Sequence, residues 1–235
     1  MIFLLVGTFW IAAAGAGQDQ TAKVAIHFQP QSPTEAFVNA TAEYDALWKA
    51  EGARMVAAME RISGLPFEER EIKAVIYEGV SFSGSGNTPM QLRASYPAEV
   101  KEATLIHELS HRMLGRVKTT KEIDEHRKIF LVLYDIWVDL YGKEFADRNV
   151  AVESQRKGLY DYESAWKWAL AMSAEDRAAT FKTLRFEPGP TGTSRSAVSS
   201  TGEPSALHPV RCCVCAFRAA CRSIHSTHRI GSGSR

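Results

Sequence analysis

The sequence predicts an α+β fold, with a small mixed sheet packed on a long first helix and on a second helix near the middle of the chain. Runs typical of strands occur only before residue 95. Helical periodicity dominates from residue 97 to residue 184. The hydrophobic content of 45% suits a chain with a buried core. We therefore expect the sheet to be followed by a helical C-terminal half.

Both ends of the chain differ in composition from its body. Residues 1–16 are almost wholly apolar and end in an A-x-A-like cleavage pattern, although no Lys or Arg precedes the apolar run. We expect residues 1–16 to be a signal peptide, with a retained anchor or a misassigned start as alternatives. Residues 187–235 are dominated by Pro, Gly, Ser, Thr and Arg, which is typical of a disordered low-complexity tail. The predicted domain is residues 17–186, secreted or periplasmic, with no stable membrane span after signal removal.

Three short strands are expected in the first half. Residues 24–29 alternate loosely between apolar and polar side chains and end at a proline. Residues 72–77 form a second strand, and residues 90–94 form a third that suits a sheet edge. A loop rich in Gly and Ser, residues 81–88, separates the second strand from the third.

The first helix is expected between the first two strands. Apolar or small residues recur at helical spacing over residues 37–62 and stop near Gly64, and Ser32 suits the N-cap. Gly52 is the weak point, because glycine inside a helix costs about 1 kcal/mol relative to alanine. It marks either a break into two helices or a close contact with a neighbouring element.

Caps, stops and periodicity predict the later helices. A capping box at Thr119–Glu122 is expected to begin the helix that follows the central one. The expected ranges are 97–115, 123–142, 143–157, 162–172 and 174–184.

The strongest functional signal lies in the helix expected at residues 97–115. It reads His107-Glu-Leu-Ser-His111. Helical residues four apart lie on the same face, so two imidazoles can point at one metal ion. Glu108 lies beside them and can take a proton from a water that the metal activates. Chance spacing of ordinary helix residues is the alternative, but the predicted cap and stop favour a metal site.

A catalytic zinc site keeps three protein ligands and leaves one position for water or substrate. His126 is the main candidate for the third ligand. It falls on the apolar stripe of the next helix, where a histidine needs a polar partner. A core histidine bonded to a backbone carbonyl is the alternative. Glu125, Asp124 and Glu153 remain alternative ligands, as does a site without a third protein ligand.

The motif, within a helix that follows a strand-rich segment and a long first helix, resembles the zincin metallopeptidases. A third histidine on the next helix is similar to the SprT-like arrangement, although Arg127 follows His126 where that group usually has glycine. The metzincin form would need glycine at position 114 and histidine at position 117, and the chain has Leu114 and Val117. A gluzincin arrangement would use Glu153.

This resemblance implies a zincin-like fold and a zinc-dependent peptidase that hydrolyses a peptide or protein substrate. It implies Zn²⁺ bound by His107, His111 and His126, with Glu108 as general base. It also implies that the strand ending near Ala94 lines the substrate cleft. A zinc-binding scaffold protein of the same fold without turnover is the alternative, and a hydrolase of non-peptide amides is a third hypothesis.

Other features of the sequence give weaker evidence about function. Tyr134, Tyr141 and Arg93 could stabilise an oxyanion, which needs a nearby donor, but each also suits a core or surface position. The formal net charge of +1 gives no basis for a nucleic-acid partner. All four cysteines lie after residue 187, so no disulfide framework is expected in the predicted domain.

Overall fold

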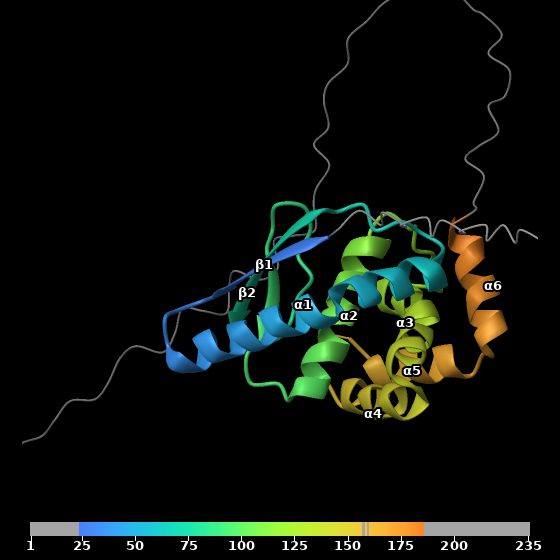
Figure 1. Ribbon diagram of the computed structural model, residues 1–235. Coiled ribbons are helices and arrows are strands. Elements are labelled where there is room, and N and C mark those ends of the chain that lie inside the picture. The colour runs from blue at the N-terminus through green and yellow to red at the C-terminus, as the bar shows by residue number, and fades with distance from the viewer. Residues whose placement is uncertain (1–23, 157, 159, 186–235) are drawn as a thin grey trace, which may run out of the picture. The chain divides into compact units, whose positions relative to one another are not determined.

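The computed structural model describes residues 24–156, 158 and 160–185 (Figure 1). The predicted signal peptide and the predicted tail lie outside these described residues. None of the described helices is both long enough and apolar enough to span a bilayer. Within the described residues, three strands and six helices follow in the order β1 (Ala25–Pro30), α1 (Glu35–Ser63), β2 (Glu71–Tyr77), β3 (Met90–Arg93), α2 (Ala98–Leu114), α3 (Glu125–Tyr141), α4 (Lys143–Ser154), α5 (Tyr162–Leu170) and α6 (Ala174–Arg185). The expected α+β fold, with a helical second half, is confirmed.

The three strands form one sheet in the order β1-β2-β3, and both pairs are parallel. Ile26 lies opposite Ile72, and Ala74 lies opposite Met90. The expected mixed sheet is therefore not observed. Antiparallel pairing in the described residues is limited to isolated bridges. For β1 and β2 the cause is the long crossover through α1, which returns the chain to the same end of the sheet, and residues 78–89 return it again before β3.

Helix α1 is continuous across the glycine that was expected to weaken it. A Cβ atom at Gly52 would lie 2.6 Å from Cδ2 of Trp48. The glycine therefore makes room for the indole ring one turn earlier on the same helix. The N-cap is Thr34 and not Ser32. The helix ends at Gly64, whose φ of 62° is the left-handed conformation that glycine adopts without strain.

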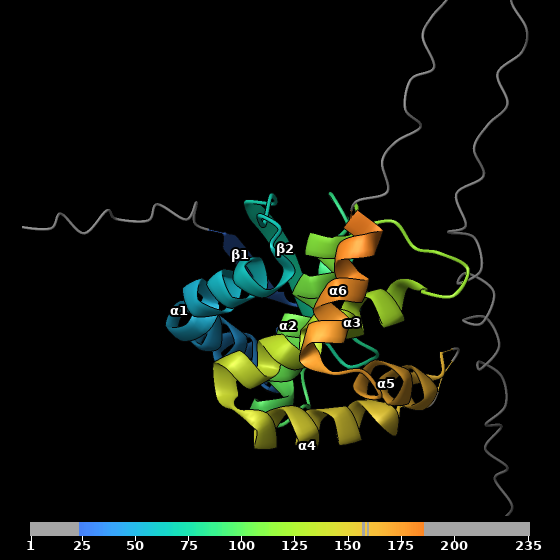
Figure 2. The same ribbon diagram turned by 90° about the vertical axis from the view of Figure 1, so that its right-hand side faces the viewer.

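Helix α2 carries the H-E-x-x-H motif and is buried along most of its length. It contacts α1, α3 and β3. Helix α3 in turn contacts α4, α5 and α6 (Figures 1 and 2). The indole of Trp166 on α5 stacks on the ring of Phe130 on α3 with 3.8 Å between centroids. The pair of helices α2 and α3 thus connects the sheet-bearing part to the helical part.

The start of α3 differs from the expected capping box at Thr119–Glu122. The Oγ1 atom of Thr120 accepts a hydrogen bond from the backbone of Ile123 and closes a turn ahead of the helix. The helix begins after Asp124, whose side chain accepts from the backbone N–H of Arg127 at 2.9 Å. His126 is consequently the second residue of α3.

Candidate metal centre

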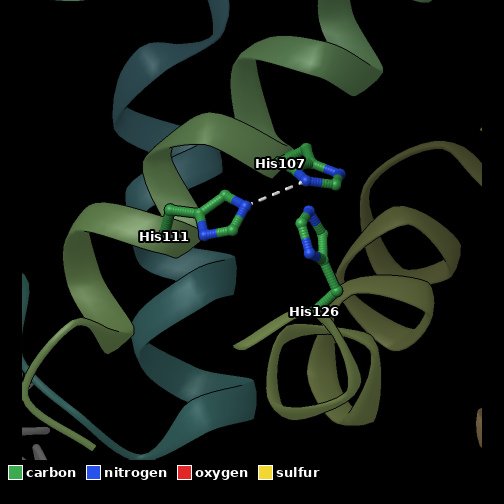
Figure 3. A group of neighbouring side chains, drawn as sticks. All are labelled: His107, His111 and His126. Carbon is green, nitrogen blue, oxygen red and sulfur yellow. Dashed lines mark hydrogen bonds between the residues drawn. The ribbon is translucent and has the colours of Figure 1, made fainter. Parts of the chain in front are cut away.

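Three histidines meet at the contact between α2 and α3. His107 and His111 come from α2, and His126 comes from α3, and their rings point toward one another (Figure 3). The Nε2 atoms of His107 and His111 are 3.2 Å apart. One ring nitrogen from each histidine lies within 4.8 Å of the other two. The structure thus brings together the three side chains that spacing and periodicity singled out.

A buried lysine links helices α2 and α3. The Nζ atom of Lys128 donates to the carbonyls of Leu114 and Val117, both at 2.9 Å, and to the carboxylate of Glu125 at 2.8 Å. Leu114 is the last residue of α2, so its carbonyl lacks a partner within the helix. The ammonium group therefore ties the C-terminal end of α2 to the first turn of α3, where His126 lies.

The orientation of His107 is fixed by Glu153 on α4. The Nδ1 atom of His107 lies 2.7 Å from Oε1 of Glu153, and both side chains are buried. The other carboxylate oxygen accepts from Nε1 of Trp166 at 3.0 Å. Burial alone would lower the pKa of His107, but the charge and hydrogen bond of Glu153 more than offset it, and the pKa is raised. A carboxylate on Nδ1 leaves Nε2 as the metal-binding atom.

The three acidic residues considered as alternative third ligands make other contacts. Glu153 lies behind His107 and outside the group of three nitrogens. Glu125 places Oε1 3.7 Å from Nδ1 of His111, on the side of the ring away from His107. Asp124 caps α3 and also accepts from the hydroxyl of Tyr160 at 2.8 Å.

His126 is enclosed by two tyrosines. Its ring stacks on Tyr160 with 4.2 Å between centroids, and its Nε2 atom lies 3.1 Å from the hydroxyl of Tyr162. Burial, together with the neighbouring His107 and His111, lowers the pKa of His126 to about 3. The imidazole is therefore neutral near pH 7, which is the form that binds a metal ion.

Glu108 opens onto a cleft of about 450 Å³ beside the histidines. The cleft is lined by residues of α2 and α3, by Tyr162 and by residues 81–85. Burial raises the pKa of Glu108. The carboxylate thus has a stronger affinity for a proton than an exposed glutamate, a property suited to a general base.

The residues fit a zinc ion. The donor set is three imidazoles, which zinc accepts as ligands, and all three histidines line the cleft. Two nitrogens at 2.0–2.1 Å from a tetrahedral zinc would stand about 3.3 Å apart. The 3.2 Å between the two Nε2 atoms on α2 agrees with that separation.

The sequence missed the tyrosine that borders the cleft. None of Tyr134, Tyr141 and Arg93 is among the described residues that line it. Tyr134 instead donates to Asp147 on α4 at 2.8 Å. Tyr162 does line the cleft, and burial raises its pKa to about 12. The position of Tyr162 depends on how α5 folds back onto α3, and no motif in the sequence carries that information.

The expected role of the third strand also needs correction. No residue of β3 is among the described residues that line the cleft. The wall is formed by residues 81–85, and Phe82 of this segment pairs with Gln91 along the free edge of β3. The loop therefore lies where the strand was expected.

Comparisons of the chain with protein-family models, with curated proteins and with solved structures return no match in any of the three. The centre is therefore defined by its own geometry, as three histidines from α2 and α3 that could hold a metal ion.

Proposed function

We propose that this protein is a zinc-dependent peptidase of the zincin type. His107, His111 and His126 bind the metal, and Glu108 is the general base. The observation that supports this most directly is the convergence of three imidazoles beside a buried glutamate on one cleft. The substrate is a peptide or a protein.

The chemistry divides between the metal and the protein. When bound, a zinc ion supplies Lewis acidity that brings the pKa of a water in the cleft from ~15.7 toward about 7. Glu108 takes a proton from the attacking water and returns it to the leaving amine as the peptide bond breaks. The raised pKa of Glu108 brings the carboxyl closer to the working pH, where it can both accept and release that proton.

Tyr162 supplies the donor that the reaction needs at the developing oxyanion. With a pKa raised to about 12, its phenol keeps its proton at neutral pH. Its hydroxyl lies beside His126 and at the cleft, where a substrate carbonyl would approach the metal. A donor preorganised at that point stabilises charge that develops only in the transition state.

The apolar N-terminal sequence supports a separate proposal about the location of the protein. We propose that residues 1–16 are removed as a signal peptide and that the protein acts outside the cell or in the periplasm. An N-terminal sequence beginning at Gly17 in the secreted protein is the expected result. A retained N-terminus at Met1 would contradict this proposal and leave the peptidase proposal unaffected.

A scaffold that binds zinc without turnover is the second candidate. The buried network of His107, Glu153 and Trp166 favours it, because such a network also serves a purely structural metal. This candidate predicts zinc in the purified protein, and no cleavage of any member of a peptide library.

The decisive experiment is the Glu108→Gln variant. We expect it to keep its zinc while hydrolysis of library peptides falls by about 10²- to 10⁴-fold, because proton transfer is lost and the metal ligands are not. The matched control is Glu102→Gln on the same helix, a residue not among the described ones that line the cleft. Hydrolysis by Glu108→Gln at the rate of the natural protein would reject the peptidase mechanism.

A further inference from the structure

The residue that follows the second histidine of the motif is a buried arginine. The side chain of Arg112 is 1% exposed. Its Nε and Nη2 atoms form a two-point ion pair with Glu69. Its Nη1 atom donates to the carbonyl of Ser83 at 2.6 Å and to that of Thr88 at 3.4 Å, and Nη2 donates to Gly86 at 3.2 Å. One guanidinium thus holds three carbonyls of the loop that walls the cleft.

Apart from Arg112, the described contacts of the loop are hydrogen bonds with β3 and a turn from Ser85 to Thr88. Residues 81–88 are Ser, Gly, Asn and Thr apart from one phenylalanine, so they bury little apolar surface. Gly84 and Gly86 have φ values of 63° and 51°, which glycine tolerates and most other residues do not. Charge-assisted hydrogen bonds are about twice as strong as neutral ones. Arg112 is therefore the main link between this loop and the helix of the metal centre.

The phenylalanine of the loop has a backbone that is paired with β3. The N–H of Phe82 donates to the carbonyl of Gln91 at 2.9 Å, and the N–H of Gln91 donates back at 2.8 Å. Phe82 is among the residues that line the cleft, and it is 53% exposed. Its neighbours on this wall are Ser and Gly, so it is the wall's large apolar group. An aromatic side chain of this kind gains most when a ligand covers it.

We propose that residues 81–88 are the specificity wall of the cleft. Phe82 contacts an apolar side chain of a peptide substrate, and Arg112 is a positioning residue that holds the wall beside His111. The substrate part of this inference rests on the proposed function. The part that concerns Arg112 does not.

Limited digestion with chymotrypsin tests the role of Arg112 without reference to activity. Lysine keeps the charge but lacks the planar fork that reaches several acceptors at once. In Arg112→Lys we expect cleavage after Phe82, mapped by mass spectrometry, to be at least about tenfold faster, because cleavage tracks the population of the open loop. Zinc content is expected to stay unchanged.

The matched control is Arg116→Lys. Arg116 follows shortly after α2 and bonds Glu68 and the carbonyl of Pro66, and neither of these partners belongs to the loop of residues 81–88. Its cleavage rate should equal that of the natural protein. Equal rates in Arg112→Lys and the natural protein would overturn the positioning role. If Arg112→Lys does not fold, Glu69→Gln is the second variant, because it weakens the ion pair that holds Arg112. Unchanged cleavage in Glu69→Gln would also overturn the positioning role of Arg112.

Peptide binding tests the role of Phe82. The protein is the full chain with Glu108→Gln, loaded with zinc. It is titrated with fluorescein-labelled octapeptides of Ala and Ser that contain one Leu or Phe. Control peptides carry Glu at the same position. We expect the apolar peptides to bind more tightly, and Phe82→Ala to remove about tenfold or more of that preference, the usual scale for lost apolar contacts. Val80→Ala is the control, because Val80 is 81% exposed and is not among the described residues that line the cleft.

The outcomes separate the two proposals. A preference that survives in Phe82→Ala overturns the specificity wall, whether or not the natural protein hydrolyses peptides. A preference that depends on Phe82, in a natural protein without hydrolysis, supports the wall and rejects the peptidase.

Discussion

The ring of His107 is held at both nitrogens. Nδ1 faces Glu153 at 2.7 Å, and Nε2 faces the Nε2 atom of His111 at 3.2 Å. The neighbouring His111 is held more loosely, with 3.7 Å between its Nδ1 atom and the carboxylate of Glu125. Carboxylates in these positions fix the tautomer and increase the basicity of a ligand histidine. Of the two, the buried Glu153 makes the closer contact.

Replacing Glu153 with glutamine should weaken zinc binding. We expect the dissociation constant to rise by about 10- to 100-fold, because the amide keeps the shape but not the charge that favours a metal-bound imidazole. Competition with a chromogenic chelator measures the change. The control is Glu144→Gln on the exposed side of α4, where the affinity should not change. Equal affinity in both variants would contradict the orienting role.

The residues of the site differ in how far the sequence could predict them. His107 and His111 follow from a local rule, since their spacing places them on one face of one helix. His126 follows from its place on an apolar stripe. The contact of Glu153 with His107 and that of Tyr162 with His126 arise only when α4 and α5 fold back onto α2 and α3. Such contacts leave no trace in spacing or periodicity.

At the scale of elements, the first turn of α3 determines where the third histidine lies. Asp124 accepts from the backbone of Arg127 at the helix start and from the hydroxyl of Tyr160. Tyr160 also stacks on His126. The cap, the aromatic contact and the histidine therefore form one unit, and loss of the cap should displace the ring nitrogen.

Removal of this cap is expected to affect stability and metal binding together. Asp124→Ala should lower the free energy of unfolding by about 0.5–2 kcal/mol, because the backbone N–H at the helix start loses its acceptor. Zinc affinity should fall as well. Asp124→Asn is the matched variant, since asparagine caps helices about as well as aspartate. Urea unfolding and chelator competition measure the two effects. Identical behaviour of the two variants would show that capping is not the cause.

The elements show where local signals suffice and where they conflict. The strands lie within one residue of their expected ranges, because alternation is a local property. The start of α3 was expected at a capping box beginning at Thr119, but Asp124 offers a second cap five residues later, and the contact with Tyr160 favours it. The parallel direction of the strands depends on the two connections between them, the crossover through α1 and residues 78–89. The alternation within a single strand does not indicate whether that strand pairs in the parallel or the antiparallel direction.

At the scale of the whole molecule, the candidate metal centre lies between two helices that connect the parts of the fold. Helix α2 contacts β3 and α1, and α3 contacts α1 as well as α4, α5 and α6. The order of strands before helices made the α+β class predictable from the sequence. The convergence of α2 and α3 on one cleft was predictable only through the histidines. A metal held by ligands from both helices would link the sheet-bearing part to the helical part.

Chelation should therefore lower the melting temperature. At free zinc about 100 times the dissociation constant, a bound ion adds about 2.7 kcal/mol to the free energy of unfolding. For a chain of 150–250 residues, each kcal/mol shifts Tm by about 2–4 °C. We expect a fall of about 5–10 °C when a chelator is added, measured by calorimetry. Hydrogen exchange should increase at the end of α2 and the start of α3.

The same measurement decides whether His126 is a ligand. In His126→Ala, the link between the helices is lost, so chelator should shift Tm much less than in the natural protein, and zinc should bind more weakly. His27→Ala is the control, because His27 lies on β1 with its ring paired to Glu71 at the surface. A chelator shift and a zinc affinity in His126→Ala equal to those of the natural protein would leave the metal on α2 alone. Glu125, the remaining acidic side chain of that first turn that lines the cleft, would then be the next ligand to test.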